Sequence, residues 1–283
     1  MQHFSKYFLV VVAVIVISIL PVACTQRSLA PLQSHSVNGL TSQNITDSEH
    51  HYFHKTEKPH KAEWGYEGDT GPKHWGDLSP DYILAKQGKL QSPIDISKSI
   101  EKELPDIVFN YRPVKINLVY NGHTIEEEEG GSHVLVNEDL FELKQFHFHA
   151  PSEHTINGKH ADMEMHLVHK AKDGTVAVVA VMIEQGAENR SFTSIWENLP
   201  TPVKREVQVA RTVDATDLLP RNHTYYRYRG SFTTPPCTEG VTWFVLTVPI
   251  ELSPGQINKF KSIINNNNRP TQHLNERKIY LSE

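Results

Sequence analysis

Three histidines in two strand-like stretches are the residues of this sequence best placed for chemistry. In residues 145–149 the residue types alternate, so an extended strand would put His147 and His149 on one face. His166 lies in a second alternating stretch, beyond a turn-prone segment at residues 157–159, and antiparallel pairing would bring it to the same face. Three neutral imidazoles that leave one position for water form the ligand set of a catalytic zinc site.

A polar residue accompanies each stretch where it could orient a histidine ring. Gln145 lies two residues before His147, and Glu164 lies two residues before His166. Such partners fix the tautomer of a metal-binding imidazole. The pattern therefore favours a zinc site over the other interpretation, in which these are hydrogen-bonded core histidines. That second interpretation is kept for three neighbouring histidines: His154, His160 and His169.

The composition limits what else the protein could bind. The chain has 283 residues, 17 histidines and only two cysteines, Cys24 and Cys237, so imidazoles rather than thiolates would have to hold a transition metal. The formal net charge is -5, and no block of Lys and Arg occurs, which argues against a nucleic-acid partner. With 38% hydrophobic and 22% charged residues, the chain is typical of a soluble globular protein.

The N-terminus has the pattern of an export signal. Lys6 precedes an apolar run over residues 7–20, which is short for a membrane span. Cys24 follows Val22-Ala23, as in a lipoprotein cleavage site, so residues 1–24 are predicted to be a signal peptide or a lipoprotein leader. The mature protein is expected to be periplasmic or secreted, and a lipid on Cys24 would anchor it to a membrane. The sequence leaves cleavage with and without lipidation open.

Beyond the leader the chain divides into a linker and one domain. Residues 25–61 are polar and show no periodicity, which predicts a disordered linker. Residues 62–283 show short β-branched and aromatic runs between turn residues, which predicts a mostly β domain. Helices are expected at Ser191–Asn198 and at Pro254–Asn265, the latter capped by Ser253. The clearest strands are Ile107–Phe109, Lys115–Tyr120, His133–Val136, Glu142–His149, Asp162–Lys170, Thr175–Glu184, Val207–Val209 and Thr242–Pro249.

With these stretches in place, a series of motifs follows along the chain. They are Trp64-Gly65-Tyr66, Gly71-Pro72, His74-Trp75, Gln91–Ile96, Asn121-Gly122-His123, Phe146–His149, Ser152–Thr155, Glu164–His169, Gly230–Pro236, Val241-Thr242-Trp243 and Asn268-Arg269-Pro270. In their order and approximate spacing, these motifs closely resemble the alpha-class carbonic anhydrases of the exported, bacterial type. The resemblance implies one domain built on a large twisted, mostly antiparallel sheet of about ten strands with a few short peripheral helices. It also implies that the chain uses zinc to interconvert carbon dioxide and bicarbonate.

The resemblance assigns roles around the metal. His147, His149 and His166 would be the zinc ligands, with Gln145, Glu164 and a backbone carbonyl near Asn267 accepting hydrogen bonds from their rings. Glu153 would accept the hydroxyl proton of Thr233. That hydroxyl oxygen would in turn accept a hydrogen bond from zinc-bound hydroxide, the nucleophile, and Thr234 would line the substrate side.

Further roles concern the substrate and the proton. An apolar wall would receive carbon dioxide, although packing alone would make the same residues core, and His123 would carry the proton to buffer. Histidine suits that task because its unperturbed pKa lies near ~6.5. Sulfonamides and small anions are expected to inhibit, and the protein to be a monomer or homodimer. The wall residues are Val168, Val178, Phe232, Val241 and Trp243.

The sequence departs from many exported members of the family in its cysteines. Cys237 takes the place of one cysteine of their disulfide, but residues 83–88 hold no partner. Cys237 is therefore expected to be a free thiol or to pair between chains. Two other functions remain as alternatives: a carbonic-anhydrase-like binding module without activity, and a zinc esterase. The complete set of ligands argues against the first and the cramped apolar wall against the second.

Overall fold

The computed structural model describes residues 62–128, 131–202 and 204–283. The predicted leader at residues 1–24 and the predicted linker at residues 25–61 lie outside the described residues. None of the helices in the described part of the chain has the length and apolar character needed to cross a membrane.

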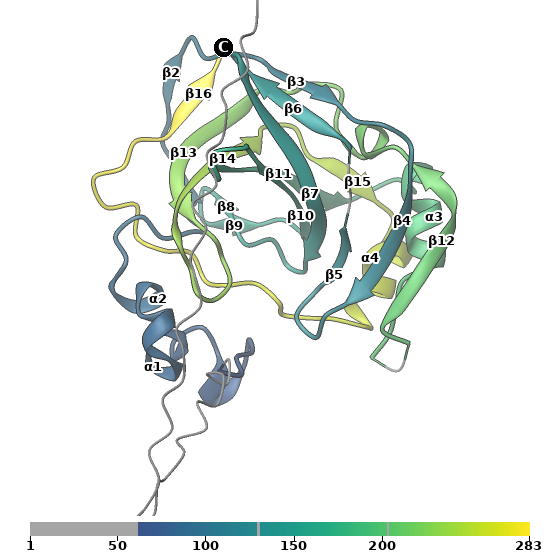
Figure 1. Ribbon diagram of the computed structural model, residues 1–283, viewed down its shortest axis with the longest axis horizontal. Coiled ribbons are helices and arrows are strands. Elements are labelled where there is room, and N and C mark those ends of the chain that lie inside the picture. The colour runs from purple at the N-terminus through teal and green to yellow at the C-terminus, as the bar shows by residue number, and fades with distance from the viewer. Residues whose placement is uncertain (1–61, 129–130, 203) are drawn as a thin grey trace, which may run out of the picture. The chain divides into compact units, whose positions relative to one another are not determined.

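One large mixed sheet organises the domain, and thirteen of the strands in the described residues belong to it. Ten of these strands follow one another in the order β12-β4-β5-β7-β10-β11-β14-β13-β16-β2, and the ribbon curves from β12 round to β2 (Figure 1). Most neighbours are antiparallel, whereas β11 pairs in parallel with β14 and β15, and β16 pairs in parallel with β2. The predicted fold class is confirmed.

The bounds of the ten ordered strands follow the chain closely. They are β2 (Ile100–Lys102), β4 (Val114–Tyr120), β5 (Ile125–Glu128), β7 (Asp139–His149), β10 (Met163–Lys170), β11 (Val176–Gln185), β12 (Glu206–Val213), β13 (Tyr225–Ser231), β14 (Glu239–Leu246) and β16 (Tyr280–Ser282). Three strands pair outside this order: β3 (Ile107–Asn110), β6 (His133–Val136) and β15 (Ile250–Leu252). A separate small sheet contains β1 (Asp95–Ile96), β8 (Thr155–Ile156) and β9 (Lys159–His160).

The helices are short, as expected. In the part of the chain that the structure describes they are α1 (Trp75–Leu78), α2 (Leu84–Gln87), α3 (Thr193–Glu197) and α4 (Pro254–Lys261), with four 3₁₀ turns at Gly68–Thr70, Pro80–Tyr82, Arg190–Phe192 and Ala215–Leu218. Ser253 caps α4 in a reciprocal capping box with Gln256, which satisfies two backbone N–H groups at the start of the helix. In Figure 1, α3 and α4 lie beside β12 and β4, on the opposite side of the domain from α1 and α2.

The central strands present two different faces. Phe146, Phe148 and Leu167 are at most 1% exposed and belong to the main hydrophobic cluster, so we call the side of β7 and β10 that carries them the core face. The core face is covered by the helices, because Phe148 contacts Trp196 of α3 and Phe260 of α4, with ring centroids 5.2 and 5.9 Å apart. The opposite side, which carries the three predicted ligands, is called the metal face.

Several predicted boundaries were wrong. The strand expected at Thr242–Pro249 is β14, which runs from Glu239 to Leu246, because the chain turns before Pro249 and begins β15 at Ile250. The helix expected to reach Asn265 ends at Lys261, and the one expected from Ser191 begins as a 3₁₀ turn before α3. Four predicted strands, β3, β4, β7 and β12, are longer in the structure, and β7 begins at Asp139 because its first residues pair with β6.

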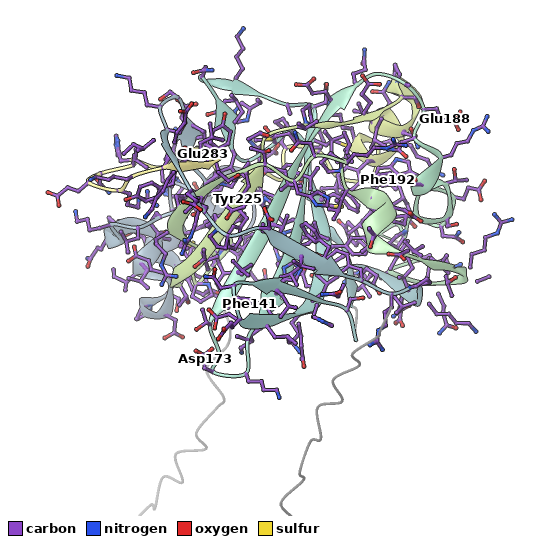
Figure 2. The ribbon with its side chains drawn as sticks, turned by 90° about the horizontal axis from the view of Figure 1, so that it is seen from above. Phe141, Asp173, Glu188, Phe192, Tyr225 and Glu283 are labelled. Atoms are coloured by element: carbon purple, nitrogen blue, oxygen red, sulfur yellow. The ribbon has the colours of Figure 1, made fainter. Side chains whose placement is uncertain are left out.

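The tips of the sheet hold the polar turn residues. Asp173 lies in the turn between β10 and β11, at the outer end of the hairpin, and its carboxylate accepts a hydrogen bond from the Thr175 backbone N–H (Figure 2). Gly174 in the same turn has a φ of 93°, a conformation that a residue with a Cβ rarely adopts. The turn aligns β10 with β11 over eight residue pairs, from Met163 to Lys170, and so fixes where His166 lies.

Candidate metal centre

The register of β7 and β10 brings the three predicted ligands together. His147 lies directly opposite His166, and His149 lies opposite Glu164, so all three imidazoles point to the metal face. One ring nitrogen from each of the three histidines lies within 4.8 Å of the others. Their ring centroids are 4.7 to 5.1 Å apart, and the three rings therefore surround a single point.

Each ring is oriented through its other nitrogen. Nδ1 of His147 is 2.7 Å from Oε1 of Gln145, and Nδ1 of His149 is 2.7 Å from the backbone oxygen of Asn267. Nε2 of His166 is 2.8 Å from Oε1 of Glu164. Since all three partners are acceptors, each ring donates its proton outward and turns the bare nitrogen inward.

The inward nitrogens fit a metal ion. Within the described residues, Nε2 of His149 is a buried polar atom with no hydrogen-bond partner, a costly arrangement for a protein that holds nothing there. A set of three nitrogen ligands with room for a fourth is the usual donor set of catalytic zinc. The residues present therefore fit the ion that the sequence predicts.

Burial keeps these imidazoles neutral. It lowers the pKa of His149 to about 4 and holds the pKa of His147 well below the ordinary value, with the neighbouring histidines adding to the second shift. The pKa of His166 is also lowered by burial, although Glu164 opposes the shift. Neutral imidazole is the form that binds a metal, so the centre is ready for a cation at neutral pH.

A buried hydrogen-bond chain extends from His166 away from the metal centre. Burial disfavours the charge of Glu164, but His154 and His166 outweigh it and hold the pKa of this carboxyl well below its usual range. Its Oε1 lies 2.6 Å from Nδ1 of His154, whose Nε2 lies 2.7 Å from the hydroxyl of Tyr228. The Tyr228 hydroxyl is 2.8 Å from Oγ of Ser92. His154, Glu164 and His166 also lie close enough together to be considered as metal ligands. Their facing atoms are hydrogen-bonded to one another, so we interpret this group as a hydrogen-bonded triad and not as a second metal site.

Most of this hydrogen-bond chain was not predicted from the sequence. From the sequence, His154 is expected to be an ordinary hydrogen-bonded histidine, and Tyr228 and Ser92 have no assigned role. Nothing in the local pattern signals their meeting, since Tyr228 lies 74 residues from His154 and 136 from Ser92 along the chain. The Ser92 and Tyr228 positions lie in or beside matched motifs, which is the only signal that could have pointed to them.

Glu153 and Thr233 lie beside the metal centre. Glu153 is fully buried, and its Oε1 accepts a hydrogen bond of 2.8 Å from the backbone N–H of Arg269, while its Oε2 lies 3.4 Å from Nε2 of His149. Burial raises the pKa of Glu153 to about 7, against the opposing effect of His166 and of hydrogen bonds from Arg269 and Thr233. Thr233 is thus the side-chain hydrogen-bonding partner that lowers the pKa of Glu153, and a hydroxyl that donates to this carboxyl group keeps acceptor capacity only.

The predicted apolar wall lies next to the ligands. Val168 of β10 pairs with Val178 of β11, which pairs with Trp243 of β14, so the three side chains share one face. Val241 belongs to the same buried cluster, and Phe232 packs against it. The ring of Trp243 lies 4.9 Å from that of His166, and the wall therefore begins at the metal centre.

Two further predicted residues, His123 and Thr234, are only partly buried, and we call their region the rim of the site. His123 is partly buried in the turn before β5, where its ring stacks on Trp64 with centroids 3.6 Å apart and planes at 8°. Thr234 is partly buried in the loop after β13, where its carbonyl accepts a hydrogen bond from the backbone N–H of Cys237. Cys237 itself is a fully buried free thiol, and burial raises its pKa to about 11.

Comparisons with known proteins agree with this geometry. The family model of the eukaryotic-type carbonic anhydrases matches residues 70–283. The carbonic anhydrase of Klebsiella pneumoniae is 44% identical over 222 residues, which cover 77% of this chain and 90% of that protein.

Solved structures show the same likeness. The alpha-carbonic anhydrase of Thermovibrio ammonificans in complex with the inhibitor sulfanilamide superposes with a TM-score of 0.76 at 45% identity, covering 78% of this chain and all of that one. A hyperthermostable carbonic anhydrase from a hydrothermal vent chimney gives a TM-score of 0.75 at 49% identity, with the same coverage.

The curved mixed sheet is a mostly β scaffold, and its three inward histidines are a ligand set typical of catalytic rather than structural metal centres. Together with the match over most of the chain, it shows that this protein belongs to the alpha, or eukaryotic-type, carbonic anhydrase family.

Proposed function

We propose that this enzyme catalyses the reversible hydration of carbon dioxide with zinc held by His147, His149 and His166. The observation that carries the proposal is the trio of inward nitrogens within 4.8 Å, each on a ring whose other nitrogen is hydrogen-bonded. When bound, zinc supplies the Lewis acid that makes water an effective nucleophile near neutral pH, as is established for carbonic anhydrases. Neutral ligands leave the full charge of the ion available for this purpose.

Glu153 and Thr233 orient the nucleophile. Because the Thr233 hydroxyl gives its proton to Glu153, its oxygen can accept a hydrogen bond only from a group that brings a proton of its own. The Arg269 backbone N–H holds Glu153 in place at 2.8 Å. This pair therefore selects a protonated oxygen over other small ligands and fixes the direction of its lone pair.

The apolar wall receives the substrate. Carbon dioxide carries no charge and offers little for hydrogen bonds to hold, so an apolar surface beside the nucleophile is the suitable receptor. Val178, Val241 and Trp243 are at most 2% exposed, which makes this part of the wall rigid. Its closeness to the ligands leaves little room for the acyl group of a large ester, and the esterase alternative is accordingly not favoured.

His123 moves the proton. Its ring stacks on Trp64, and its backbone is fixed by the turn, in which the Asn121 side chain accepts from the His123 N–H at 2.8 Å and Asn267 donates to the His123 oxygen at 3.1 Å. An imidazole near the rim of the site can take a proton and release it to buffer close to neutral pH. We assign His123 this relay.

Two further properties of the enzyme are proposed, namely inhibition by sulfonamides and export from the cytoplasm. A sulfonamide such as sulfanilamide should bind at the metal centre, since it forms a complex with the Thermovibrio ammonificans relative.

We further propose export from the cytoplasm, supported by the apolar run at residues 7–20, with Cys24 as a lipid attachment point. Intact-mass analysis of the mature protein separates a lipid adduct on Cys24 from simple cleavage.

The test of the function is metal dependence of hydration. Stopped-flow measurements on the full chain, with zinc determined on the same sample, should show about one zinc per chain and rapid hydration. Removal of zinc with a chelator should abolish the activity, and zinc alone should restore it. Hydration that persists at full rate after complete removal of the metal would overturn the proposal.

A further inference from the structure

A cavity that differs in charge from the metal centre lies at the edge of the sheet formed by β13, β16 and β2, which run side by side in Figure 1. Tyr228, which belongs to the hydrogen-bond chain from His166, is part of its lining. Its volume is about 570 Å³. Although the chain as a whole has a net charge of -5, this cavity is lined by five cations and by Glu276 alone among carboxylates. The cations are Lys102, Arg227, Arg229, Arg277 and Lys278.

The sheet brings these charges together from three distant parts of the sequence. Arg227 and Arg229 are two residues apart on β13 and share one face. Arg227 lies opposite Tyr280 of β16, and β16 pairs in parallel with β2, which carries Lys102. Positive charges placed close together repel one another, so their convergence is not explained by stability alone.

The arginines are held in position by groups other than carboxylates. Arg277 donates to the backbone oxygens of Leu274, Arg229 and His273 at 2.9, 3.0 and 2.7 Å. Arg229 donates to the hydroxyl of Thr242. Within the described residues, none of the five cations forms an ion pair with a carboxylate. Lys102 and Arg277 instead lie over the rings of Tyr280 and Tyr228, at 5.0 and 5.7 Å from the ring centroids. Because no carboxylate is paired with these cations, their positive charge is available to a ligand.

We infer that this cavity binds an anion that carries a phosphate group. Guanidinium groups match phosphate oxygens in pairs, and lysines add point charges that suit phosphate equally well. The cations that line the cavity come from three separate segments, namely β2, β13 and the residues before β16, and a tetrahedral group with several oxygens can contact more of them than a planar carboxylate can. The volume falls within the range of small-molecule sites and exceeds a single phosphate ion, so a phosphate ester fits.

Two sources share this chemistry, a soluble phosphate ester and the headgroup of an anionic lipid. Calorimetric titration of the zinc-loaded full chain with glycerol phosphate at low ionic strength tests the first. Co-sedimentation with phosphatidylcholine vesicles, with and without phosphatidylglycerol, tests the second. Saturable binding of glycerol phosphate identifies a soluble ligand, and sedimentation only with phosphatidylglycerol identifies a headgroup.

A pair of matched variants decides whether the cavity is responsible. Arg227→Gln/Lys278→Gln removes two cavity charges that make no hydrogen bond or ion pair among the described residues, and Lys204→Gln/Arg211→Gln removes two exposed charges at the β12 end of the sheet. We expect the cavity variant to weaken binding by roughly tenfold or more and the control to change it little, because charge-assisted contacts are worth about this much each.

Three results would overturn the inference: no binding of either probe, equal weakening in both variants, or undiminished binding in the cavity variant. Carbon dioxide hydration measured on the same samples shows that each variant is folded. Since neither Arg227 nor Lys278 touches the metal centre, hydration should stay at the wild-type rate whether or not the cavity binds phosphate.

Discussion

The two faces of β7 and β10 consist of alternate residues of the same strands, yet they are held together in different ways. On the core face, Phe148 and its neighbours are packed by aromatic and aliphatic contacts beneath α3 and α4. On the metal face, His166 and Glu164 are just as buried but are held by hydrogen bonds between polar groups. Because successive residues point to opposite faces, one face stabilises the fold and the other carries the metal ligands. Substitutions on the core face should therefore lower the free energy of unfolding, whereas substitutions on the metal face should abolish zinc binding and activity.

The largest effect is expected on the metal face. His166→Ala removes one of three ligands, so zinc and hydration should be lost together, while the fold persists because the core face is untouched. Metal analysis, hydration assays and circular dichroism on one sample measure this. His273→Ala, an exposed histidine, is the matched control and should keep both. Full zinc occupancy in His166→Ala would remove this residue from the site.

The converse change on the core face should cost stability. Phe148→Ala empties a fully buried position among Phe192, Trp196 and Phe260, and we expect the free energy of unfolding to fall by about 3–5 kcal/mol. Urea unfolding measures the loss, with Val108→Ala as the exposed control at less than about 0.5 kcal/mol. The folded fraction should still bind zinc stoichiometrically. Loss of zinc from folded Phe148→Ala protein would show that the two faces are not separable.

Within the metal face, Glu153 and Thr233 are expected to act as a unit. Glu153→Ala and Thr233→Ala should each lower kcat/KM by about 10²–10³, since each removes the same oriented hydrogen bond. The double variant should be little worse than the more damaging single one, because residues that act as a unit are strongly non-additive. Stopped-flow assays of the four proteins give the cycle. Losses that simply multiply would show that the two residues act independently.

A smaller effect is expected at the rim. His123→Ala should lower kcat in dilute buffer by about tenfold or more while kcat/KM, which reports attack on carbon dioxide, changes little. Added imidazole should restore much of the lost kcat, because a dissolved base of similar pKa replaces the tethered one. If kcat/KM falls as far as kcat and imidazole has no effect, His123 shapes the turn rather than moving protons.

The sequence predicts local alternation well and long-range contacts poorly. The ligand strands were predictable because His147 and His149 alternate with phenylalanines. β13 was not predictable, since its run of tyrosines and arginines puts bulky residues on both faces and shows neither the alternation of a strand nor the period of a helix. The pairing of β7 with β10 shifts between Val168 and His169, so Leu143 and Phe146 both belong to the core cluster although they are three positions apart, an odd spacing. No alternation rule anticipates such an irregularity.

In the metal centre, too, contacts between residues close in the sequence were predictable and contacts between distant residues were not. Partners two residues away, such as Gln145 beside His147, follow from strand geometry. Partners far along the chain do not: the carbonyl of Asn267 reaches His149 across 118 residues and was expected only through the family resemblance. The chain through His154 and Tyr228 and the basic cavity at β13 depend on the assembled sheet, and only the structure shows them.

The smallest effect is expected at His169, a buried histidine on the core face of β10, in contrast to the histidines of the metal face. His169 is fully buried with its Nε2 2.7 Å from the Tyr111 hydroxyl, and burial lowers its pKa to about 3. In the unfolded chain its pKa returns to about 6.5, so between these values the unfolded state binds a proton that the native state does not. The contribution of His169 to the free energy of unfolding is therefore fully present above about pH 6.5 and falls as pH decreases toward 3, by at most about 1.4 kcal/mol per pH unit.

His169→Gln should be less stable near neutral pH yet lose stability less steeply as pH falls, since it removes one titrating group while keeping a partner for Tyr111. Urea unfolding of the wild type and the variant between about pH 5 and pH 7 gives both slopes. The histidines of the metal face contribute equally to the two proteins and cancel in the difference, so identical slopes would show that His169 is not held neutral by the core.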